Sequence, residues 1–206
     1  MKMVCLDVEG VLLPEIWQEL ARATGLVALA RTTRDEPDYG KLMAGRIAAL
    51  NKSGVGHADI MAIAANVEPL PGARAFLNRI RQSYQVALVS DSFAEFLMPL
   101  APKLGWPSLY CHNLLCGDAG EVAGWRPRLP DQKPKCVRAF QSLGFRVFAA
   151  GDSFNDLGML RSADGAAFIH APDSIAALIP ELPRCADHDA LEAEIGQFFT
   201  RTAQAT

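Results

Sequence analysis

The sequence predicts an α/β fold: a doubly wound parallel sheet with a small helical cap inserted after the first strand. Two observations predict it. Short apolar runs alternate with amphipathic helical segments along most of the chain, and two of those runs, 4–6 and 147–151, lead directly into a cluster of glycine and acidic residues. Strand–helix alternation is typical of parallel sheets, because parallel neighbours need a crossover connection.

The first strand is predicted within Val4–Val11, an apolar segment interrupted by two carboxylates and a glycine. Strand side chains alternate between the two faces, so Asp7 and Glu9 project the same way where the extended geometry persists. Open α/β sheets bind ligands at the carboxyl ends of their strands. The alternative is a strand that ends in a solvated polar loop, and this stretch alone does not decide between the two.

The next sixty residues have helical patterns. Pro14 and Gly25 bracket a first helix that begins near Ile16, and apolar faces predict two more helices, around 42–50 and 60–67. A simple connection is shorter than this. We therefore expect two parts, an α/β core of residues 1–13 and 70–206 and a helical cap subdomain of residues 14–69.

The remaining elements continue the alternation. An i, i+3, i+4, i+7 apolar stripe predicts a helix over 71–83, and the glycine-rich turn 117–120 predicts a hairpin. In chain order we expect strand 85–90, helix 93–104, hairpin strands 109–115 and 121–125, helix 133–144, strand 147–151 with a helix after it, strand 166–170 and helix 189–199.

A second acid cluster follows the strand 147–151. Asp152 stands at the strand end, Ser153 is placed to cap the next helix, and Asn155 and Asp156 fall in its first turn. Acids on two strand ends can converge on one divalent cation. Hard oxygen ligands, with no histidine pair or Cys-x-x-Cys nearby, favour Mg²⁺ over zinc.

Composition excludes several classes. The net charge of −3 over 206 residues, without a basic run, argues against nucleic acid as a partner. Asp7 interrupts the first apolar run and no segment reaches the ~18 apolar residues of a membrane span, so we expect neither a signal peptide nor a membrane partner. The odd, scattered cysteines predict reduced thiols and a cytoplasmic location. Cys111, His112 and Cys116 make half a metal site without its other half, and we expect strand residues there instead.

The motifs D-x-E-G and G-D-S-x-N-D, each after a strand, resemble those of the haloacid dehalogenase-like phosphatases. Two further segments agree with this resemblance: Ser90 ends a strand where the family places its phosphate-binding Ser or Thr, and Lys133 precedes a helix where the family places its lysine. All four elements stand in the family's order. The resemblance implies a Rossmann-like core.

The resemblance also implies a mechanism. Asp7 attacks phosphorus and forms an aspartyl-phosphate, while Glu9 acts first as acid and then as base. Ser90 and Lys133 bind and neutralise the phosphoryl group, although Lys135 is an alternative for the lysine. The implied Mg²⁺ ligands are Asp7, the backbone carbonyl of Glu9, and Asp152; Asp156 helps to hold the ion and orients Lys133, and Asn155 contacts the phosphate or its neighbours.

The whole chain resembles the phosphoserine phosphatase branch. There, a glutamate soon after the nucleophile binds the substrate ammonium and a cap arginine binds its carboxylate; Glu15 and Arg46 stand at the matching places. Solvated helix faces are the alternative for both residues. Arg128 is a candidate for one more anion contact.

The chain departs from that branch at Glu9, where aspartate is usual, and at Asp91-Ser92, where a glycine pair is usual. In these features it is closer to the bifunctional phosphoserine phosphatase–homoserine phosphotransferases. We therefore expect a Mg²⁺-dependent phosphatase of L-phosphoserine that also transfers phosphate to homoserine, with Asp91 and Ser92 in the substrate site. A phosphatase of another small phosphometabolite, such as a sugar phosphate, and a catalytically silent binding protein are the alternatives. A short cap leaves apolar surface on which a homodimer could form.

Overall fold

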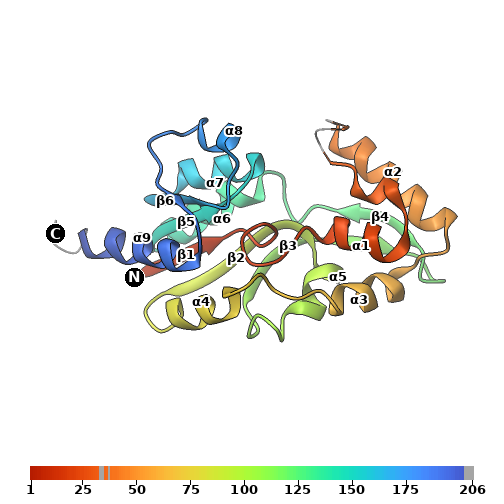
Figure 1. Ribbon diagram of the computed structural model, residues 1–206, viewed down its shortest axis with the longest axis horizontal. Helices are drawn as coiled ribbons and strands as arrows, with labels where there is room; N and C mark the ends of the chain where they lie inside the picture. The colour runs from red at the N-terminus through yellow and green to blue at the C-terminus, as the bar shows by residue number, and fades with distance from the viewer. Residues whose placement is uncertain (33–34, 37, 202–206) are drawn as a thin grey trace.

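A seven-stranded sheet forms the centre of the computed structural model, which describes residues 1–32, 35–36 and 38–201 (Figure 1). Its strand order is β4-β3-β2-β1-β5-β6-β7, and all neighbours are parallel except β3 and β4. The strands are β1 (Lys2–Leu6), β2 (Gln85–Phe93), β3 (Ser108–Cys116), β4 (Val122–Arg126), β5 (Arg146–Gly151), β6 (Gly165–Ile169) and β7 (Arg184–Cys185). Because the sheet extends in both directions from β1, the prediction of a doubly wound α/β fold is confirmed.

Helices cover both faces of the sheet. They are α1 (Ile16–Thr24), α2 (Tyr39–Lys52), α3 (His57–Ala65), α4 (Ala73–Ile80), α5 (Ala94–Leu97), α6 (Gln132–Ser142), α7 (Leu157–Ser162), α8 (Asp173–Ala176) and α9 (His188–Arg201). Consecutive residues of β1 pack into hydrophobic clusters on opposite faces of the sheet. Val4 packs in the cluster that contains residues of α4 and α9, and Cys5 packs in the cluster that contains residues of α6 and α7. This two-sided burial explains why β1 is an almost uninterrupted apolar run.

The helices α1, α2 and α3 gather with the β3–β4 hairpin at one end of the molecule, opposite α7 and α9 (Figure 1). Polar and aromatic contacts join them to that hairpin. The Asn51 side chain donates to the Val122 carbonyl at 2.9 Å, and the Tyr39 ring meets Trp125 edge to face at a centroid distance of 5.1 Å. The helical segment is therefore anchored on a hairpin that belongs to the core sheet.

The hairpin and most helix limits agree with the sequence predictions to within a few residues, but the helix expected over 93–104 is wrong. Strand β2 continues to Phe93, α5 ends at Leu97, and a 3₁₀ turn, Met98–Leu100, follows it. Pro99 and Pro102 lack the N–H groups that a longer helix would need. The short elements α8 and β7 carry too few residues for a periodic signal and were not predicted. Throughout the described ranges, every helix is too short or too polar to cross a lipid bilayer.

Candidate active site

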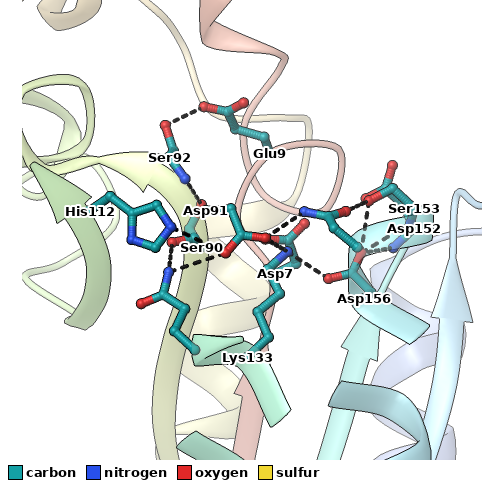
Figure 2. A network of polar contacts seen from close by, with 12 residues as sticks. Asp7, Glu9, Ser90, Asp91, Ser92, His112, Lys133, Asp152, Ser153 and Asp156 are labelled. Atoms are coloured by element: carbon teal, nitrogen blue, oxygen red, sulfur yellow. Dashed lines mark hydrogen bonds and ion pairs between the residues drawn. The ribbon is translucent and has the colours of Figure 1, made fainter. Parts of the chain in front are cut away.

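The candidate site lies where the carboxyl ends of β1, β2 and β5 meet (Figure 2). Asp7 follows β1 directly, and its backbone N–H donates to the Ala150 carbonyl of β5 at 3.0 Å. Asp152 follows β5, while Lys133 reaches in from the first turn of α6. The two acid clusters that are far apart in the sequence are therefore neighbours in space.

The acid cluster of this site consists of three carboxylates, those of Asp7, Asp152 and Asp156, and the ammonium group of Lys133. Asp7, Asp152 and Asp156 each offer an oxygen, and these oxygens all lie within 4.8 Å of one another. Lys133 Nζ lies 3.0 Å from Asp7 Oδ1 and 2.8 Å from Asp156 Oδ1, and its side chain is only 2% exposed. With every group ionised, the cluster carries two negative charges more than positive ones, which is costly in a buried place.

The pKa values of two of these acids reflect their burial and the excess of negative charge. Burial, followed by the like charge of Asp156, raises the pKa of Asp7 well above its usual range. The same two causes, in the same order, raise the pKa of Asp152 to about 7. Hard carboxylate ligands with an excess charge of −2 suit a divalent cation such as Mg²⁺. The residues present therefore fit that ion.

Asp156 differs from the other two acids because both of its oxygens are already engaged. Oδ1 accepts from Lys133, and Oδ2 accepts from the backbone N–H groups of Asp152 and Ser153, each at 3.0 Å. Asp156 thus orients the lysine and the loop after β5. Asp7 and Asp152 keep more lone pairs open for a cation.

Glycine permits this close assembly. Gly10 has a φ of +75°, and a Cβ built at this residue would overlap the Asp152 carboxylate. A side chain there would be strained as well as obstructed. The loop after β1 can therefore approach the end of β5 only because residue 10 has no side chain.

At the end of β2, Ser90 is buried, and the Asp91 carboxylate is contacted by hydrogen-bond donors of other residues. Asn155 Nδ2 donates to Asp91 Oδ2 at 2.9 Å, and Gln132 Nε2 lies 3.3 Å from Asp91 Oδ1. Lys133 Nζ lies 3.8 Å from Asp91 Oδ2. The structure therefore links Asp91 to the lysine and to the loop after β5.

Glu9 lies apart from the acid cluster, beside Ser92. Ser92 Oγ donates to Glu9 Oε1 at 2.6 Å (Figure 2). Burial, followed by the negative charge of Glu15, raises the pKa of Glu9 to about 8. A carboxyl group with this pKa is largely protonated at neutral pH, as a general acid must be.

Arg46 lies close enough to Glu9 and Glu15 to interact with their charges. Its guanidinium stacks over the Trp17 ring at 4.5 Å and donates to the Arg31 carbonyl. Arg46 is 7% exposed, and among the described residues its Nε has no hydrogen-bond partner. A buried N–H group without a hydrogen-bond partner costs free energy, and an acceptor atom of a ligand can supply that partner.

Two of the candidates, Arg128 and Lys135, are exposed. The Arg128 guanidinium lies over Tyr110 and contacts Gln132 and Cys136, so it reaches Asp91 indirectly, through Gln132. Lys135 is exposed on α6, so Lys133 is the lysine that the structure brings to the acids.

The sequence analysis missed two site residues, Gln132 and His112. Gln132 directly precedes Lys133 in the sequence, and this adjacency was the available signal. His112 lies buried on β3 with its Nε2 3.6 Å from Asp91 Oδ1. In the sequence, His112 stands out only as part of the pattern Cys111, His112 and Cys116, which gives no sign of Asp91.

The buried carboxylate–lysine cluster lies at the carboxyl ends of the strands, where open α/β sheets bind their ligands. The family described as haloacid dehalogenase-like hydrolase matches residues 1–164. The chain belongs to this family, as the sequence motifs predicted.

Similar proteins agree with this assignment. The chain is 43% identical over 193 residues to a phosphoserine phosphatase of Pseudomonas syringae pv. tomato. The matched region covers 94% of this chain and 81% of that protein. It is also 43% identical to phosphoserine phosphatase ThrH of Pseudomonas aeruginosa, over 98% of both chains. A crystal structure of a phosphoserine phosphatase from T. onnurineus has a TM-score of 0.72 at 24% identity, over 94% of both chains, and supports the fold.

Proposed function

We propose that the protein is a Mg²⁺-dependent phosphatase of L-phosphoserine that works through an aspartyl-phosphate on Asp7 and also transfers the phosphoryl group to homoserine. The observation that carries the proposal is the ion pair of Asp7 with the buried Lys133 inside the acid cluster. The two relatives named phosphoserine phosphatase support the substrate.

In the first half-reaction, a carboxylate oxygen of Asp7 attacks phosphorus and the bond to the serine oxygen breaks. Glu9 gives its proton to that departing oxygen. Its pKa of about 8 supports this role, because most Glu9 side chains carry a proton at neutral pH. When bound, Mg²⁺ would be held by Asp7, Asp152 and the Glu9 backbone carbonyl, and it would offset the repulsion between the phosphate dianion and the attacking carboxylate.

In the second half-reaction, Glu9 is a carboxylate and takes a proton from the acceptor that attacks the aspartyl-phosphate. Water gives inorganic phosphate, and the homoserine hydroxyl gives O-phosphohomoserine. The hydrogen bond from Ser92 supports this step, since it orients Glu9 and stabilises its charged form. Ser90, Lys133 and Asn155 bind the phosphoryl oxygens.

Recognition of an amino acid is assigned to the helical segment. Arg46 binds the substrate carboxylate. Its buried Nε, which has no hydrogen-bond partner within the described part of the chain, supports this role, as does the Trp17 ring on which the guanidinium stacks. Glu15 binds the substrate ammonium. In this proposal α1, α2 and α3 form the cap predicted for residues 14–69, and Arg128 has no direct role.

The test is phosphate release from L-phosphoserine with Mg²⁺, with and without homoserine, while O-phosphohomoserine is followed by mass. We expect phosphohomoserine to increase at the expense of free phosphate when homoserine is added. Asp7→Asn should abolish both products, and full turnover by that variant would refute the proposal. Hydrolysis of sugar phosphates in place of phosphoserine would support the alternative phosphometabolite enzyme, and no turnover at all would support a binding protein.

We further propose that the enzyme works in the cytoplasm. All five cysteines are free, which supports a reducing compartment. The homodimer remains a prediction, and sedimentation of the purified chain would test it.

A further inference from the structure

Asp91 is the unusual member of the site, because its carboxylate is surrounded by donors that the proposed reaction needs for a phosphate. Asn155 Nδ2 lies 2.9 Å from its Oδ2, and Lys133 Nζ lies 3.8 Å from the same oxygen. Gln132 Nε2, which also donates to the Ser90 carbonyl, lies 3.3 Å from Oδ1. Asp91 thus contacts the same hydrogen-bond donors that bind the phosphoryl oxygens in the proposed reaction.

A phosphate dianion and the Asp91 carboxylate compete for these donors. Lys133 already lies within 4 Å of Asp7, Asp156 and Asp91, so one ammonium is shared among three carboxylates. A phosphoryl group that draws on Lys133 and Asn155 meets a like charge at short range, which weakens its binding. Either Asp91 remains and repels the phosphoryl group, or Asp91 moves away.

Asp91 is the most exposed of the three acids that contact Lys133. Its side chain is 36% exposed, whereas those of Asp7 and Asp156 are 6% and 0% exposed. His112 offers a position to which it can turn. His112 Nδ1 accepts from the Arg128 backbone N–H at 3.1 Å, so a neutral imidazole carries its proton on Nε2, the atom 3.6 Å from Asp91 Oδ1.

We propose that Asp91 is an internal competitor of the phosphoryl group and thereby sets the affinity of the site for phosphoesters and for the phosphate product. In this structure its carboxylate contacts Lys133 and Asn155. When a phosphoryl group binds, Asp91 turns from those donors towards His112. The competition weakens binding of inorganic phosphate and so favours product release. This inference rests on the proposed function, since it requires phosphate at this site.

The test measures inorganic phosphate binding by calorimetry in the presence of Mg²⁺, together with its competitive inhibition constant against L-phosphoserine. Asp91→Asn keeps the size of the side chain and removes its charge, and Asp91→Gly removes the side chain. Asp118→Asn is the matched control, because it removes the same charge from an exposed position in the hairpin turn. Thermal unfolding of each variant reports on folding.

We expect both Asp91 variants to bind phosphate about tenfold more tightly, as one like charge removed from a partly exposed site implies, and the Asp118 variant to match the parent. Unchanged or weaker phosphate binding in Asp91→Asn, with L-phosphoserine still hydrolysed, would overturn this inference and leave the proposed function intact. If the parent chain neither binds phosphate nor hydrolyses L-phosphoserine, the proposed function fails, and this inference fails with it.

Discussion

The charge imbalance in the acid cluster predicts how the stability of the metal-free protein depends on pH. The pKa of Asp152 is raised from an ordinary 3.8 to about 7 in the folded state. A carboxyl group whose folded pKa is raised binds its proton more tightly in the folded chain than in the unfolded chain. Its stabilising contribution is therefore complete below pH 4 and is lost as the pH rises towards 7.

The size of this effect follows from the two pKa values. A difference of about 3 pKa units corresponds to about 4 kcal/mol. Because Asp152 is only partly buried, solvent screens its charge, and we expect about 2 kcal/mol of this difference to be measurable. Magnesium should restore this amount at pH 8, since a divalent cation replaces the missing protons.

Chemical denaturation of the chain in EDTA and in Mg²⁺, at pH 5 and pH 8, measures these quantities. Asp152→Asn is the decisive comparison because it keeps the shape of the side chain and removes its charge. In EDTA at pH 8 this variant should be about 2 kcal/mol more stable than the parent, and Mg²⁺ should no longer stabilise it to the same extent. If Asp152→Asn is less stable than the parent in EDTA at pH 8, the electrostatic reasoning is refuted.

Two further predictions concern catalysis. Glu15→Gln removes a negative charge that raises the pKa of Glu9 in the free protein, so the loss of kcat/KM at alkaline pH should move to lower pH by about one unit. A pH profile of kcat/KM with L-phosphoserine measures this, and an unmoved profile contradicts it. Arg46→Lys replaces a planar, bidentate donor by a point charge, so the KM for L-phosphoserine should rise about tenfold. Turnover of p-nitrophenyl phosphate, which has no carboxylate, should change about twofold at most in that variant, and an equal loss for both substrates would argue against carboxylate recognition.

Much of the fold could be predicted because its signals are local. The glycine-rich turn at 117–120 forms the hairpin between β3 and β4, and Gly25 ends α1 in the left-handed conformation. The acids Asp7 and Asp152 each follow a parallel strand, so they lie close together because β1 and β5 are neighbours in the sheet.

The remaining features depend on contacts that no spacing encodes. Nothing near Arg128 in the sequence shows that its guanidinium stacks on Tyr110, because a long side chain can turn in many directions. His112 is placed by packing between Phe93 and Trp125 and by one backbone N–H, all of which come from other segments. The extent of β2 beyond Ser90 is likewise decided by pairing with β3, where the register shifts between Val89 and Phe93.

The position of β1 at the centre of the sheet also has a consequence for how the chain acquires its structure. Val4 pairs with Val86 on one side and with Phe148 on the other. Ribosomes make the amino-terminal strand first, yet its second edge stays unpaired until β5 has been made. Contacts at such separation slow folding and leave apolar edges open to other chains in the meantime. The acid cluster, which needs β5 paired beside β1, is therefore expected to form in the late steps of folding.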